Sequence, residues 1–187
     1  MTNDKRIAQQ ILNIFEKTPG FYRYGDETES KYVDLAICAN TPEEGISSYA
    51  TIGLFQTNIG LTYNAKPLRI ELLAAGAQSV ESFDNIMATT AFEIMDAQTA
   101  FPGYVVNNVV SMYIPNREMR HILLTHPFLW DNTQSLTLPD LTVAWLMCVP
   151  ISDQEKIYCE QNGLDALETI FEQHQIDIFD ITRQSTL

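Results

Sequence analysis

Residues 143–172 have the sequence VAWLMCVPISDQEKIYCEQNGLDALETIFE, and this stretch decides the fold. The run Leu141–Ile151 is almost entirely apolar, which predicts a strand buried on both faces at the centre of a sheet. Ser152 follows it, and Glu155 three positions later gives the spacing of a helix capping box. An Asn-Gly pair interrupts this helix, and Leu164–His174 predicts a second one. The stretch therefore predicts a central strand followed by two helices.

Outward from this stretch, the sequence predicts two more helices and several strands. Residues 4–17 place isoleucines at helical spacing opposite polar side chains, and Ser79–Ala100 has a long apolar face with Ser79 as its cap. The predicted strands are Phe21–Gly25, Lys31–Cys38, Ile46–Leu54, Leu68–Ala74, His121–Pro127 and Ile176–Thr182. Because strands and helices do not alternate strictly, the predicted class is α+β. We expect one domain over residues 1–187, with a mixed, largely antiparallel sheet, an N-terminal helix, a long central helix and two C-terminal helices.

The charge of the chain is strongly acidic and unevenly distributed. Aspartate and glutamate number 24 against 11 lysines and arginines, and residues 76–187 hold 15 of the acidic side chains but only 4 basic ones. Such a field repels nucleic-acid phosphates and anionic membrane surfaces and speeds the encounter with a basic protein. Acidity that only serves solubility is the alternative. With no apolar run of membrane-span length and no signal-peptide pattern, we expect a cytoplasmic protein.

Patterns that would carry catalysis or metal binding do not stand out. His121 and His126 are five residues apart, on opposite faces of a strand, which makes a poor metal pair. The three cysteines are too far apart for a CxxC site, and Cys38 and Cys148 are expected in the core. No GxSxG, GxxxxGK[ST] or HExxH motif is present. We therefore expect no catalytic residue, cofactor or metal, and an unrecognised enzyme is the third hypothesis for function.

Five segments in order carry a family pattern: Pro19–Glu27 (PGFYRYGDE), Ser47–Leu54 (SSYATIGL), Ile114–Pro127 (IPNREMRHILLTHP), Val143–Glu172 and Ile176–Ser185 (IDIFDITRQS). Together they resemble the suppressor of fused family over essentially the whole chain. The resemblance implies a mixed α/β domain that binds other proteins and is not an enzyme. Short bacterial members of that family look like immunity proteins, or antitoxins, that neutralise secreted toxins. The stretch before His121 is shorter than in the animal member, so no peptide-contact residue is carried over.

The resemblance and the charge lead to the first hypothesis, that the protein is an immunity protein that occludes a cognate toxin domain. We expect this toxin domain to be a basic nuclease. The contact surface is predicted on residues 153–180, which hold eight acidic side chains. The candidate partner-binding residues are Asp153, Glu155, Glu160, Asp165, Glu168 and Glu172. For each of them the alternative is an ordinary solvated helix face. The second hypothesis is a regulatory peptide- or protein-binding module of suppressor-of-fused type, without a toxin partner, that adds a strand to a sheet edge.

Overall fold

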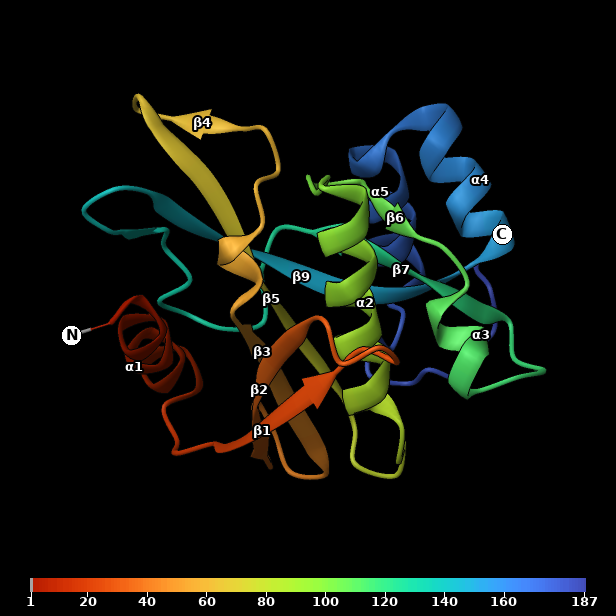
Figure 1. Cartoon of the computed structure of the whole chain (residues 1–187). Coiled ribbons are helices and arrows are strands. Elements are labelled where there is room, and N and C mark those ends of the chain that lie inside the picture. Colours follow the sequence, from red (N-terminus) through yellow and green to blue (C-terminus); the bar gives the residue numbers. More distant parts are fainter. Residues whose placement is uncertain (1) are drawn as a thin grey trace.

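The structure, a computed structural model, describes residues 2–187 as one nine-stranded sheet covered by helices (Figure 1). The elements are, in chain order, α1 (Asn3–Phe15), β1 (Gly20–Gly25), β2 (Tyr32–Ala39), β3 (Ile46–Ile52), the 3-10 helix η1 (Leu54–Gln56), β4 (Thr62–Tyr63), β5 (Lys66–Ala77), α2 (Phe83–Ala97), β6 (Val105–Val106), α3 (Val109–Tyr113), β7 (Met119–Thr125), β8 (Leu136–Thr137), β9 (Thr142–Ser152), α4 (Asp153–Asn162) and α5 (Leu164–His174).

The sheet is mixed and largely antiparallel, as predicted. Its strands lie in the order β1-β2-β3-β5-β9-β7-β6, with β4 paired to β5 and β8 paired to β9. β5 and β9 run parallel, with Leu68 opposite Thr142, whereas the other pairs are antiparallel. The apolar strand β9 lies between β5 and β7, so its predicted central position is confirmed.

Both faces of the sheet are covered, which explains why β9 is apolar along its whole length. Leu146 and Cys148 of β9 face a core closed by α2 and α3, whereas Val143, Trp145 and the other alternate residues face a second core closed by α1, α4 and α5. Figure 1 shows α2 crossing in front of the sheet, with α1 at one end and α4 and α5 at the other.

The start of α4 has the local structure that its sequence predicts. The Ser152 hydroxyl accepts a hydrogen bond from the Glu155 N–H at 3.1 Å, and the Glu155 carboxylate accepts one from the Ser152 N–H at 3.0 Å. This reciprocal pair is a complete capping box, and α5 begins after Gly163 with the predicted bounds.

One predicted element is wrong, and another begins later than predicted. The strand expected at Ile176–Thr182 is a series of turns, because Asp177 and Asp180 accept hydrogen bonds from the N–H groups two residues ahead, which stabilises turns instead of extended chain. The central helix begins at Phe83 and not after Ser79, because the N–H groups of Val80 and Phe83 close turns that precede the helix. Within residues 2–187, no helix is long and apolar enough to span a membrane.

Candidate functional site

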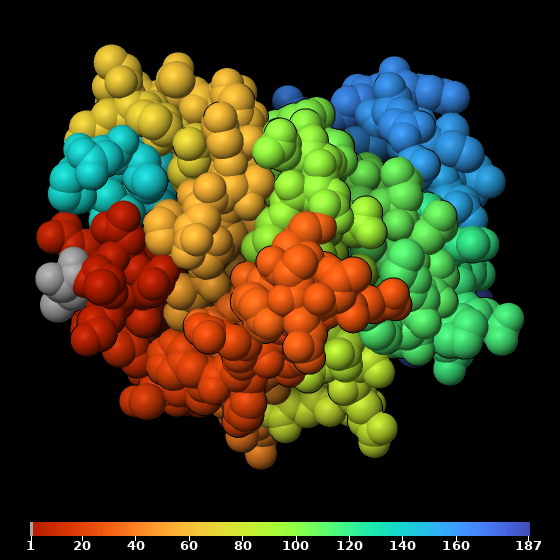
Figure 2. Space-filling model, viewed as in Figure 1, coloured from red at the N-terminus to blue at the C-terminus, as the bar shows by residue number. Residues whose placement is uncertain are grey.

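The six acidic residues predicted to bind a partner lie on α4 and α5 (Figure 1), and α4 protrudes from the surface (Figure 2). Four of them are exposed, Glu168 is half-buried and Glu155 is buried. The exposed ones are Asp153, Glu160, Asp165 and Glu172. Five of the six are therefore at least partly exposed, and their surroundings differ.

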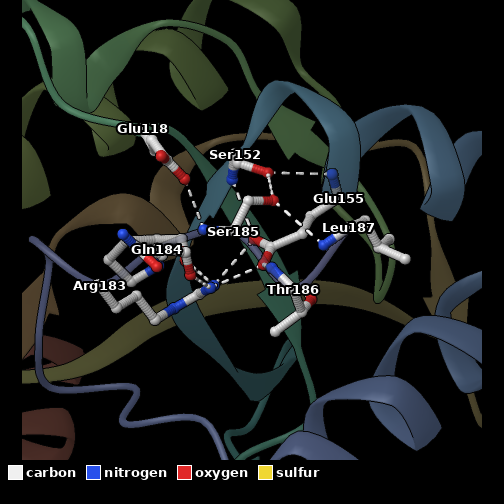
Figure 3. A network of polar contacts seen from close by, with 9 residues as sticks. Glu118, Ser152, Glu155, Arg183, Gln184, Ser185, Thr186 and Leu187 are labelled. Carbon is white, nitrogen blue, oxygen red and sulfur yellow. Dashed lines mark hydrogen bonds and ion pairs between the residues drawn. The ribbon is translucent and has the colours of Figure 1, made fainter.

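Glu155 is not part of a contact surface, and its prediction as a partner-binding residue is wrong. Its side chain is 0% exposed, and its two oxygens accept hydrogen bonds from the Arg183 guanidinium at 2.6 and 2.8 Å (Figure 3). The N–H of Thr186 also donates to it, at 3.1 Å. Burial alone would raise the pKa of Glu155, but these partners outweigh burial and hold it below its usual value. Glu155 anchors the C-terminal segment instead of binding a partner.

Asp153 is exposed but already engaged. The N–H of Asn108 donates to Nδ1 of His121 at 2.9 Å, so Nε2 carries the ring hydrogen and donates to the Asp153 carboxylate at 2.8 Å. This hydrogen bond lowers the pKa of Asp153, and Arg120 adds a cation at 3.6 Å. Asp153 is thus held by the His121 ring and paired with one cation, Arg120.

The acidic side chains of α5 form a single stripe. Asp165, Glu168 and Glu172 are spaced i, i+3 and i+7, which places them on one face of the helix. The Thr125 hydroxyl donates a hydrogen bond to Glu168 and so fixes its direction. Within residues 2–187, none of the three forms an ion pair, whereas Glu160 on α4 lies 3.7 Å from Lys156. The stripe therefore presents uncompensated negative charge.

Beside this stripe lies an apolar groove that sequence reasoning missed. It has a volume of about 410 Å³ and runs between α5 and the segment that follows β7. Its lining is Leu123, Thr125, His126, Pro127, Phe128, Val149, Glu168, Phe171, Glu172 and Ile178. No local signal marks it, because sheet pairing and helix packing bring β7, β9, α5 and residue 178 together.

The potential metal-ligating side chains are dispersed over residues 2–187, and the cysteine thiols are buried. In the part of the chain that it describes, no three His, Cys, Asp or Glu side chains are grouped as metal ligands. Burial raises the pKa of the thiols of Cys38, Cys148 and Cys159, which keeps them in the unreactive protonated form.

Comparison with known proteins identifies the family of the chain. The family model described as Suppressor of fused protein (SUFU) matches residues 29–184. This chain belongs to the suppressor of fused family. It is also 38% identical over 186 residues to a protein of Bacillus subtilis (strain 168) named Immunity protein YqcF, covering 98% of this chain and 97% of that protein.

Solved structures of the suppressor of fused family share the fold. A homologue from Neisseria gonorrhoeae matches with a TM-score of 0.72 and 17% identity over 98% of this chain and 96% of its own. The structure described as the Sufu-Fu complex matches with a TM-score of 0.67 and 13% identity, over 97% of this chain and 91% of its own. Drosophila Suppressor of Fused matches with a TM-score of 0.66 and 11% identity over 96% of this chain. The present chain spans 50% of the Drosophila chain.

Proposed function

We propose that this suppressor of fused domain is an immunity protein that binds a toxin domain and neutralises it by protein–protein contact. The observation that carries the proposal is the 38% identity to Immunity protein YqcF, because it extends over nearly the full length of both chains. The buried thiols and the absence of a metal-ligand group among residues 2–187 accord with action by binding.

We further propose that the toxin is a nuclease. A nuclease cleft carries lysine and arginine to hold nucleic-acid phosphates. This chain has a net charge of −13, and within residues 2–187 no lysine or arginine forms an ion pair with the carboxylates of the α5 stripe. Charge complementarity of this kind speeds association and rejects partners of the wrong charge.

Titration against the C-terminal domain of the toxin encoded beside the gene tests both statements. Calorimetry at about 0.05 M and 0.3 M salt, with nuclease activity measured in parallel, should show tight binding that weakens with salt and abolishes activity. Absence of binding would overturn the immunity function and favour the regulatory module without a toxin partner. Neutralisation of a toxin that does not cleave nucleic acid would overturn only the nuclease assignment.

Reversing three exposed charges should slow association. The triple variant Glu160→Lys/Asp165→Lys/Glu172→Lys should lower the association rate about tenfold at low salt and flatten its salt dependence, because local steering is lost. Stopped-flow mixing at several salt concentrations measures both quantities. The matched control Glu27→Lys/Glu43→Lys/Glu44→Lys makes the same change of net charge on exposed loops elsewhere. Equal slowing by the two triple variants would show that net charge, and not this surface, steers the encounter.

A further inference from the structure

We propose that the groove between α5 and residues 125–128 receives a large apolar side chain of the toxin domain, held beside a lysine or arginine that pairs with Glu168 and Glu172. This inference rests on the proposed function and names the surface through which it acts. The occupant is a segment of a basic protein domain that presents an apolar anchor and a cation close together.

The floor of the groove is built from the sheet. Leu123 of β7 and Val149 of β9 are direct cross-strand partners, and both side chains point to the face that α5 covers. Phe171 of α5 and Ile178 complete the apolar lining. A cavity of about 410 Å³ with a mainly apolar lining has the size and character of a site that desolvates its occupant.

The rim carries an aromatic side chain that the fold leaves uncovered. Phe128 lines the groove and is 61% exposed, although it stands in a segment whose neighbour Trp130 is buried. A single exposed aromatic is ordinary, but Phe128 is continuous with the apolar floor, and such continuous apolar surface marks binding sites. Aromatic side chains next to a desolvated pocket are the usual centres of binding energy at protein interfaces.

Charge decides which partner fits. The lining contains the carboxylates of Glu168 and Glu172 and no lysine or arginine, and Asp165 continues the stripe beyond the groove. A second copy of this chain would bring its own net charge of −13, and nucleic acids and anionic membranes are repelled in the same way. A basic protein segment with an apolar anchor satisfies both the floor and the rim.

The test measures binding of the isolated C-terminal toxin domain to full-length variants. Phe128→Ala/Glu172→Lys should raise the dissociation constant for the toxin domain at least 30-fold. The dissociation constant of the matched control Tyr63→Ala/Glu43→Lys should stay within threefold of that of the unchanged protein. Phe128→Ala alone should weaken binding by the same factor at about 0.1 M and 0.5 M salt, because loss of an apolar contact is not screened. All four altered side chains are exposed, and circular dichroism verifies that each variant is folded.

The outcomes separate this inference from the proposed function. If the unchanged protein neutralises the toxin and Phe128→Ala/Glu172→Lys binds it equally well, the groove is not the docking site and the immunity function stands. If the unchanged protein does not bind the toxin, the proposed function fails and the inference fails with it. In the complex, amide hydrogen exchange of residues 123–128 and 164–174 should slow. Unchanged exchange in these residues would also overturn the inference that the groove is the docking site.

Discussion

Arg183→Ala is expected to lower the free energy of unfolding by about 3–5 kcal/mol, because it leaves a buried carboxylate without its cation. The Arg183 side chain is 8% exposed and Glu155 is 0% exposed, so solvent cannot replace the lost partner. The same guanidinium donates to the carbonyl of Pro150 at 3.1 Å and lies 5.3 Å above the centre of the Phe171 ring. Its removal therefore loosens β9, α5 and the C-terminal segment together. Urea unfolding followed by circular dichroism measures the loss.

Two further variants identify the cause of that loss. Arg117→Ala removes an exposed arginine of the same chemistry and should change stability by less than about 0.5 kcal/mol. Glu155→Gln/Arg183→Met removes both buried charges while keeping similar volumes, and it should recover at least half of the stability that Arg183→Ala loses. If the double variant is as unstable as Arg183→Ala, the lost hydrogen bonds of the guanidinium, and not an uncompensated charge, explain the effect.

Local patterns predicted most of the fold correctly. The capping box at Ser152 and Glu155 and the apolar run of β9 depend on neighbours in sequence, so the sequence alone indicates them. The segment at Ile176–Thr182 alternates like a strand, but its aspartates bond to the backbone ahead of them and close turns. Alternation predicts a strand only where polar side chains do not offer the backbone other partners.

The candidate site was predictable only in part, for a related reason. Helical spacing places Asp165, Glu168 and Glu172 on one face without any knowledge of the tertiary structure. The same acidic composition gave no indication that Glu155 is buried, because its partner Arg183 lies 28 residues away in the chain. The groove floor also depends on the pairing of Leu123 with Val149, which no local pattern specifies.

A second buried carboxylate, that of Glu71, lies in the sheet. Glu71 of β5 is 0% exposed, and its oxygens accept hydrogen bonds from the Thr51 hydroxyl and from the N–H groups of Gly53 and Phe55, at 2.8 and 3.2 Å for the two N–H groups. No ion pair to it is formed within residues 2–187. Burial raises the pKa of Glu71 to about 7, although these hydrogen bonds oppose the rise.

The raised pKa of Glu71 makes the stability of the protein depend on pH in a defined direction. Between its ordinary value of 4.5 and about 7, the folded protein keeps a proton that the unfolded chain has lost, so stability falls as pH rises. A pKa shift of this size contributes about 3 kcal/mol to the free energy of unfolding. This contribution is present in full below pH 4.5 and is lost above pH 7. Glu71→Gln is neutral at every pH, so its free energy of unfolding minus that of the unchanged protein should grow by about 3 kcal/mol from pH 4.5 to 8.

Urea unfolding at four pH values measures this difference. Groups that titrate in both the variant and the unchanged protein cancel in the comparison. One such group is Asp26, because hydrogen bonds lower its pKa to about 2. Glu81→Gln alters an exposed glutamate in the loop before α2 and supplies the matched control. Its curve of unfolding free energy against pH should run parallel to that of the unchanged protein. A Glu71→Gln curve that is also parallel would mean that Glu71 is ionised in the folded protein throughout this range. The hydrogen bonds from Thr51, Gly53 and Phe55 would then compensate burial in full, and the turn at η1 would be a carboxylate-binding structure in its own right.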